Sequence, residues 1–248
     1  MLEKYERQLT NDEPIEFKGL KIFPVKMKDY FDFMNYVSIL TIDKNSIPDA
    51  RIISMSYLDF LILMMTEHEM KDSYSYAFYE LMKMCTQSEE LNIYYGHDEK
   101  KKIFVKINDV KINRNDFDKI KEIILYQNIP NYKFEDINPE LRAELEEKAR
   151  LENNGKKMVS IEKQIMSIVI SSSLTFDDVM NLTIRKFSIV LDMIDKKMNY
   201  KIYKTASLSG MVEFKNEIDH YLVEDDTSTA ADKVMDVNTF TSKITQGY

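Results

Sequence analysis

The sequence predicts an α+β fold that is mainly α-helical, with a small hairpin-containing N-terminal domain followed by a helical C-terminal domain. Two stretches alternate apolar and polar residues in the period of a β-strand, and both lie in the N-terminal half. Most other stretches repeat apolar residues every three or four positions, which is typical of amphipathic helices. Hydrophobic residues make up 44% of the 248 residues, enough for a core, whereas 5 Gly, 5 Pro and 1 Cys exclude a collagen-like or disulfide-stapled chain.

The N-terminal region is predicted to begin with a hairpin that leads into a helix. Residues 15–17 and 20–23 alternate in the strand period on either side of Lys18-Gly19, a short turn signal. Residues 27–40 then predict a helix. Its apolar residues share one face: Tyr30, Phe33, Met34, Val37 and Leu40.

Two further helices are expected after a polar loop at residues 43–49. Residues 52–65 are apolar nearly all round and predict the most buried helix of the chain. Residues 73–86 predict a second helix in which Tyr76, Tyr79 and Met82 are spaced at three.

A second hairpin and a helix complete the predicted N-terminal domain. Residues 91–95 and 103–107 read as its strands, with Gly96 as the natural turn residue. Asn115 is then expected to cap a helix that ends near residues 127–128. The predicted buried face of this helix consists of Phe117, Ile120, Ile123 and Ile124.

The C-terminal half reads as helical. Ser160 is placed to cap a helix over residues 161–170, and Thr175 with Asp178 resembles a capping box with Asp in place of Glu. Thr183 can cap a longer helix, in which apolar residues recur at steps of three and four: Ile184, Phe187, Leu191, Ile194 and Met198.

The predicted organisation therefore has four parts. An α+β domain with two hairpins covers residues 1–137, a charged connecting helix covers 138–157, a helical domain covers 158–223, and a flexible tail covers 224–248. The connecting helix has only a thin apolar stripe, so it is either solvated between two domains or packed on a partner. The tail lacks periodicity and is expected to order only on a partner.

The residue spacings that catalytic and metal sites need are missing. The three histidines are far apart, and adjacent acids such as Asp177-Asp178 diverge by about 100° on a helix, so neither set converges on one ion. The five glycines form no phosphate-binding loop. Cys85 has no nearby base and is expected to be a small core residue. We expect neither an enzyme nor a metal or other cofactor.

Charge and hydropathy also limit the partners. With 34 Lys+Arg against 42 Asp+Glu, the chain lacks the basic footprint that nucleic-acid binding requires. Arg185 and Lys186 nevertheless begin the third of three predicted helices, so an acidic DNA-contacting regulator remains an alternative. The longest apolar run, residues 60–65, is far shorter than the roughly 20 residues that span a bilayer, and no membrane contact is expected.

Three parts of the chain resemble proteins from the structural gene clusters of tailed bacteriophages of low-GC Gram-positive hosts. The first is a short hairpin with Pro24-Val25 entering a helix, the second is the predicted helix that starts near Asn115, and the third lies in the C-terminal region, where Tyr221 stands in place of an expected Trp. The residues that carry the resemblance are 19–25, 29, 30 and 33; 115–120, 123, 124, 127 and 128; and 178–187, 200–203, 209–212 and 220–222.

Within that class, the chain resembles the tail assembly chaperones, which are helical, acidic proteins that hold the tape-measure helix until tube subunits replace them. The resemblance implies a non-enzymatic assembly factor whose partners are phage structural proteins: the tape measure, tail tube or neck subunits, with a homo-oligomer as a further option. The residues expected to bind a partner are Leu141, Leu145, Phe187, Leu191 and Met211.

Two alternatives concern the protein's fate. As an assembly factor it would act in the cytoplasm of the bacterial host. As a structural component, such as a neck, connector or baseplate subunit, it would remain in the virion. Sixteen Met residues suit either an adaptable binding groove or a buried core.

Overall fold

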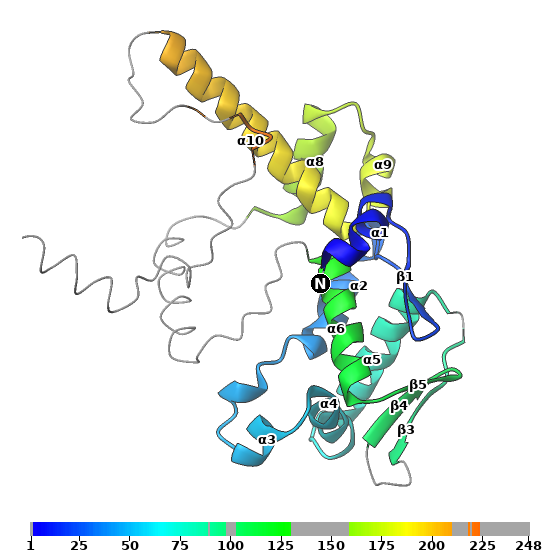
Figure 1. The fold of residues 1–248 in the computed structure, drawn as a ribbon. Coiled ribbons are helices and arrows are strands. Elements are labelled where there is room, and N and C mark those ends of the chain that lie inside the picture. The colour runs from blue at the N-terminus through cyan, green and yellow to red at the C-terminus, as the bar shows by residue number, and fades with distance from the viewer. Residues whose placement is uncertain are drawn as a thin grey trace, which may run out of the picture. The chain divides into compact units, whose positions relative to one another are not determined.

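The computed structural model describes residues 2–88, 90–97, 103–129, 159–209, 218 and 220–223 (Figure 1). These residues form helices together with one two-stranded and one three-stranded antiparallel sheet, which confirms the predicted α+β, mainly α-helical fold. The chain divides into two compact units. One consists of residues 1–136 and 159–192, and the other of residues 137–158 and 193–248.

The first hairpin forms as predicted. It follows a short helix, α1 (Glu6–Asn11), and pairs β1 (Ile15–Phe17) with β2 (Leu20–Ile22). Lys18 and Gly19 both have positive φ, 54° and 86°, as the tight turn between two such strands requires.

The helical segment at residues 27–40 is also confirmed, although it is not uniform. A 3₁₀ turn (Met27–Asp29) leads into α2 (Tyr30–Val37), and a second 3₁₀ turn (Ser38–Leu40) ends it. Of the predicted apolar face, Phe33, Val37 and Leu40 are buried, whereas Met34 is 40% exposed.

The single helix expected over residues 52–65 is wrong, because the chain forms two helices there. α3 (Ala50–Ser54) ends at Met55, whose backbone is extended, and α4 (Tyr57–Thr66) begins after Ser56. The Ser56 hydroxyl accepts a hydrogen bond from the Asp59 N–H at 3.2 Å, so a side-chain cap starts the second helix. The burial of α4 is confirmed: seven of its residues are buried.

The next helix, α5 (Lys71–Thr86), is present as predicted, and of its three residues spaced at three only Met82 is buried. Tyr76 is 58% exposed, and the buried face consists of Phe78, Leu81, Met82 and Cys85. The spacing of three does not show which of two overlapping apolar stripes of this helix is buried. Packing against α2 and α4 buries the stripe that begins at Phe78.

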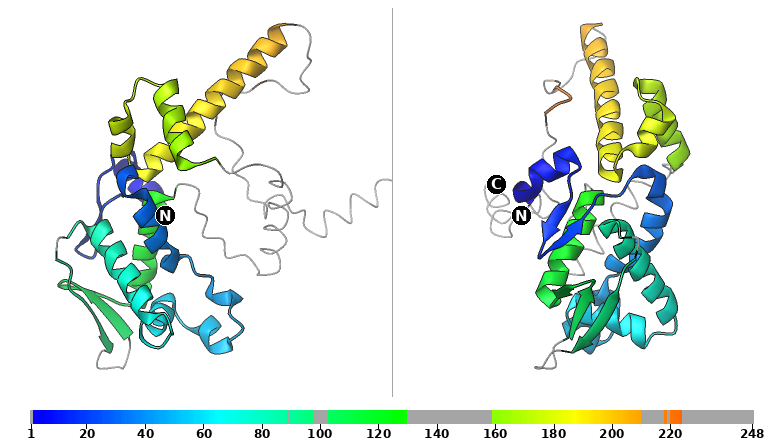
Figure 2. Two further views of the ribbon diagram at one scale, coloured as in Figure 1. Left: turned by 180° about the vertical axis from the view of Figure 1, so that it is seen from behind. Right: turned by 90° about the vertical axis from the view of Figure 1, so that its right-hand side faces the viewer.

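The second hairpin is part of a three-stranded sheet with the order β3-β4-β5. The strands are β3 (Ile93–His97), β4 (Ile103–Ile107) and β5 (Val110–Ile112), and β5 was not predicted. Gly96, the expected turn residue, instead lies within β3 opposite Phe104. The sheet packs against α4 (Figures 1 and 2).

Helix α6 (Arg114–Asn128) carries the predicted buried face and ends where predicted. Its cap is Asn113 rather than Asn115, because the Asn113 side chain accepts a hydrogen bond from the Asp116 N–H at 3.0 Å. One phenylalanine from each of four helices, α2, α4, α5 and α6, is fully buried, and these helices build the core of the first unit: Phe33, Phe60, Phe78 and Phe117.

The three C-terminal helices begin at the predicted caps. Ser160 caps α8 (Ile161–Ser171), and Thr175 forms a complete capping box with Asp178 at the start of α9 (Phe176–Asn181). The Thr183 hydroxyl accepts from the Lys186 N–H at 3.2 Å at the start of α10 (Ile184–Leu208).

The structure groups residues 159–192 with the N-terminal part, which differs from the predicted separate helical domain over 158–223. The physical reason is a set of backbone hydrogen bonds between distant segments. The Met27 N–H donates to the Leu182 carbonyl at 2.8 Å, and the Ile184 N–H donates to the Val25 carbonyl at 2.9 Å. The predicted connecting helix at 138–157 and the tail at 224–248 lie outside the described residues.

Candidate functional site

Two of the five residues expected to bind a partner can be placed. Phe187 is only 3% exposed, so in this structure it belongs to the core and presents no surface to a partner. Leu191 is half-buried. Leu141, Leu145 and Met211 lie outside the described residues.

The apolar stripe of α10 changes from buried to exposed along the helix. Its residues are Ile184, Phe187, Leu191, Ile194, Met198 and Ile202, at steps of three and four. Ile184 and Phe187 are buried, whereas Met198 is 55% and Ile202 is 58% exposed. On the opposite side of the same turns, the Tyr200 ring contacts His220 and Tyr221, with ring centroids 5.1 and 5.8 Å apart. The end of the stripe is therefore an uncovered apolar surface, which we call the distal stripe (Met198 and Ile202).

The two basic residues that could have contacted DNA are engaged within the first unit. Arg185 donates a hydrogen bond from Nη1 to the Tyr126 carbonyl at 3.1 Å, and burial lowers the pKa of its guanidinium. The Lys186 ammonium lies 2.9 Å from an Asp12 carboxylate oxygen. Both basic residues are therefore paired within the first unit, at the start of α10.

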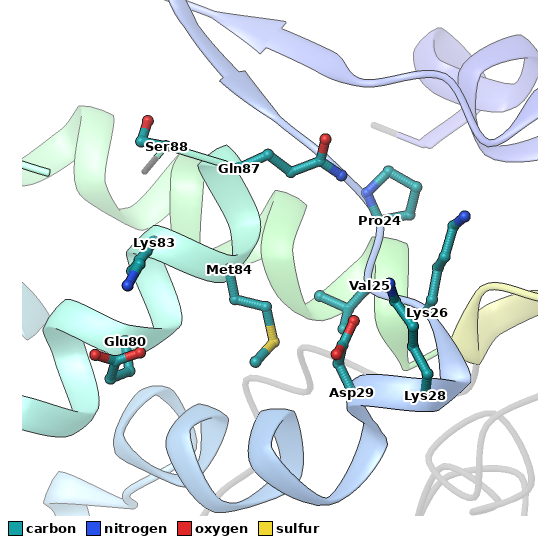
Figure 3. Close-up of a pocket in the computed structure, with 10 residues that line it drawn as sticks. All are labelled: Pro24, Val25, Lys26, Lys28, Asp29, Glu80, Lys83, Met84, Gln87 and Ser88. Atoms are coloured by element: carbon teal, nitrogen blue, oxygen red, sulfur yellow. The ribbon is translucent and has the colours of Figure 1, made fainter. Parts of the chain in front are cut away.

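A polar hollow of about 590 Å³ lies between the 3₁₀ turn before α2 and the end of α5. Figure 3 shows its residues: Pro24, Val25, Lys26, Lys28, Asp29, Glu80, Lys83, Met84, Gln87 and Ser88. The segment at Pro24 and Val25 is fixed in place, because the Phe23 N–H donates to the Cys85 carbonyl at 2.7 Å and the Val25 N–H donates to the Asn128 side chain at 2.8 Å.

The charges around this polar hollow are mixed. One wall carries Lys26, Lys28 and Asp29, and the opposite wall carries Glu80 and Lys83 (Figure 3). Because each wall holds charges of both signs and the ammonium groups do not converge on one point, the hollow is unsuited to a single anion. It suits a polar protein surface of mixed charge.

A second, more apolar hollow of about 560 Å³ lies between α4 and the ends of β3 and β4. It is lined by Met55, Asp59, Ile62, Leu63, Thr66, Glu67, Tyr95, Gly96 and Ile103. Arg114 neutralises Asp59, since its Nη2 lies 2.8 Å from an Asp59 carboxylate oxygen. The sequence prediction missed both hollows; the apolar run at residues 60–65 was a signal for the second, but it indicates burial rather than an opening.

The expectation for Cys85 is confirmed. Its side chain is fully buried in α5, and desolvation raises the pKa of the thiol to about 12, so the reactive thiolate is not available near neutral pH. Among the described residues, no group of three or more His, Cys, Asp or Glu side chains could hold a metal ion. No helix in that part of the chain has the length and hydropathy that crossing a bilayer requires.

The C-terminal region of the chain is similar to a known protein family. Residues 152–224 match the family described as the YomV second domain, a stretch of less than a third of the chain that includes α8, α9 and α10. Comparison with curated proteins and with solved structures gives no significant match. The region of α8, α9 and α10, the last of which carries the distal stripe, thus resembles the YomV second domain. This similarity fits a phage protein.

Proposed function

We propose that this protein is a non-enzymatic phage assembly factor that acts through protein–protein contacts in tail assembly, in the manner of a tape-measure chaperone. The observation that carries the proposal is the distal stripe of α10. Met198 and Ile202 continue a stripe whose first members are core residues, yet more than half of each side chain is exposed.

An uncovered stripe of this kind suits a helical partner. An amphipathic helix binds another through apolar anchors at steps of three and four, and a flexible Met side chain adapts to different partner surfaces. A tape-measure protein presents long amphipathic helices, which are suitable ligands. The net charge of −8 would keep the protein dispersed while the stripe is uncovered.

The proposal assigns the protein no reaction and no cofactor, and it places the protein in the cytoplasm of the bacterial host. The buried, protonated Cys85 supports this assignment, because it removes the one thiol from consideration as a nucleophile. The alternative is a structural virion component, such as a neck, connector or baseplate subunit, in which the distal stripe would be a permanent contact.

The proposal is tested by binding of a helical tape-measure fragment from the same phage. The double variant Met198→Glu, Ile202→Glu should weaken binding at least about tenfold, because charge in an apolar contact costs more than about 1.4 kcal/mol. The matched control is Asn199→Glu, Ser207→Glu, which adds the same charge to exposed positions of the same helix outside the stripe. No binding by the wild-type protein, or equal losses in the two variants, would argue against the proposal.

Mass spectrometry of purified particles separates the two fates. A transient chaperone should be absent from particles although it is abundant in the infected cell. Stoichiometric presence in particles would instead assign the protein to the virion. The wild-type protein could instead form a dimer through this surface. If Met198→Glu, Ile202→Glu dissociates such a dimer, the distal stripe binds a second copy of the chain.

A further inference from the structure

The outer edge of β3 is open for pairing. In the order β3-β4-β5, β3 pairs with β4 only, among the residues that the structure describes. The Asn108 N–H donates to the Asn92 carbonyl at 2.8 Å. Because hydrogen-bonded positions alternate in an antiparallel pair, the backbone groups of Tyr94 and Gly96 point toward β4. The backbone groups of Ile93, Tyr95 and His97 therefore point outward.

This edge lacks the usual protection against an added strand. Natural edge strands carry Lys, Pro or a bulge that prevents pairing with another chain. The sequence of β3 is Ile-Tyr-Tyr-Gly-His, with no proline and no Lys, Asp or Glu. Tyr94 is 63% and Tyr95 is 41% exposed.

The inner face of the same strand leads into the apolar hollow beside α4. Tyr95 lies opposite Val105, which is fully buried, so the two side chains share the inner face of the sheet. Past Val105, toward the end of β4, Ile103 on this face is only half-buried. Tyr95 and Ile103 line the hollow together with Ile62 and Leu63. A strand added to β3 would continue this face and could place a large apolar side chain there.

The charge at the rim of the hollow favours a cation. Glu67 is exposed at the C-terminal end of α4, where the helix dipole is also negative. Among the described residues, no cation forms an ion pair with Glu67, whereas the other carboxylate of the hollow, Asp59, is neutralised by Arg114. The rim therefore complements a Lys or Arg two positions from the apolar side chain, because side chains two positions apart in a strand share one face.

We propose that β3 and the apolar hollow bind an extended segment of a partner protein in which a large apolar residue has Lys or Arg two positions away, on the same face of the strand. The segment adds a fourth strand at the outer edge of β3, its apolar side chain fills the hollow, and its cation pairs with Glu67. A second copy of this chain is less suitable, because its net charge is −8. The site consists of residues from β3, β4 and α4, so it does not depend on the function proposed for α10.

The charge part of the proposal is tested with two labelled heptapeptides, Thr-Lys-Thr-Phe-Thr-Lys-Thr, whose Phe and Lys side chains share one face of a strand, and its counterpart with Glu in place of Lys. Binding is measured by fluorescence anisotropy with the full chain. The wild-type protein should bind the Lys peptide at least about tenfold more tightly than the Glu peptide, and Glu67→Lys should reverse this preference. Equal affinity for the two peptides, or no binding of the Lys peptide, would overturn the proposal. Glu67 is exposed, so its replacement leaves the fold intact.

The strand-pairing part is tested at Tyr95, whose N–H points outward. Tyr95→Pro removes this donor without removing a hydrogen bond to β4, and it should weaken binding of the Lys peptide about tenfold more than Tyr95→Ala does. Tyr95→Ala is the matched control, because it removes the same ring and keeps the N–H. Equal affinities of the two variants would contradict strand addition. A wild-type dimer that Tyr95→Pro dissociates would overturn the choice of partner and assign the edge to a second copy.

Discussion

Lys121 shows how one residue can make the stability of the protein depend on pH. Its ammonium lies 3.3 Å from the centroid of the Tyr57 ring, and its side chain is partly buried on α6. Desolvation lowers the pKa of Lys121 from 10.5 to about 8, although the nearby Asp118 carboxylate opposes this shift. The unfolded chain therefore binds a proton at this residue in a pH range where the folded chain does not.

The first prediction follows at this scale. Because the unfolded state binds more protons, the free energy of unfolding should rise as the pH is raised from about 8 to about 10. Lys121→Met should remove this rise, since Met fills the same space without a charge. Urea unfolding at several pH values measures the effect, and Lys163→Met, at an exposed position of α8, is the control that should keep the rise. An unchanged pH dependence in Lys121→Met would show that another group is responsible.

At the scale of the element, one apolar stripe of α10 lies in two environments, buried at its start and exposed farther along the helix. Its first turns are part of the core, where Phe187 is buried, and its last turns present Met198 and Ile202. A helix with uniform periodicity can thus be buried in the core at one end and exposed at the other. The distinction depends on what covers each turn and not on the spacing of the residues.

The second prediction separates these two ends. Phe187→Ala should lower the free energy of unfolding by about 3–4 kcal/mol, because it leaves a cavity in a packed core. Met198→Ala should change it by less than about 0.5 kcal/mol, because its side chain is already largely in water. Urea unfolding of both variants provides the comparison. A large loss in Met198→Ala would mean that the distal stripe is covered in the folded protein.

At the scale of the whole molecule, residues from both ends of the described chain build one unit. The Lys26–Thr183 bridge and its backbone hydrogen bonds join residues 25–27 to residues 182–184. Asp12 strengthens the junction, because it accepts a hydrogen bond from Thr183 at 3.1 Å and pairs with Lys186. This arrangement makes α8, α9 and the start of α10 part of the N-terminal unit.

The third prediction tests this arrangement with a single cut in the chain. A protease site inserted after residue 154 should allow cleavage into two pieces that still elute together in gel filtration, because both contribute to one core. They should separate only in denaturant. An independent helical domain over residues 158–223 would instead be released by the cut under native conditions.

Local signals in the sequence predicted most of the elements. The turn at Lys18-Gly19, the caps Ser160, Thr175 and Thr183, and the buried face of α6 all depend on residues within a few positions of one another, and the structure confirms them. The break at Met55 was missed because Ser56 acts as a cap within an otherwise continuous apolar run. β5 was missed because a strand of three residues has too little pattern to recognise.

The candidate sites were predicted less well, for a physical reason that applies to each of them. Phe187 and Leu191 carry the helical periodicity of a partner-binding stripe, but the same periodicity describes a core helix. The two hollows and the open edge of β3 consist of residues from separate segments, such as Glu67 and Tyr95, and no local pattern links them.

By itself, the sequence determined the α+β class, the caps and turns, the acidic charge and the resemblance to phage proteins. These features depend on composition and on hydrogen bonds between near neighbours in the chain. Only the tertiary structure decided which stripe of α5 is buried, where α10 becomes exposed, and that residues 159–192 pack with residues 1–136. These outcomes depend on contacts between separate elements, some of them more than 100 positions apart, such as Val25 with Ile184, and their energies are established only when the whole core assembles.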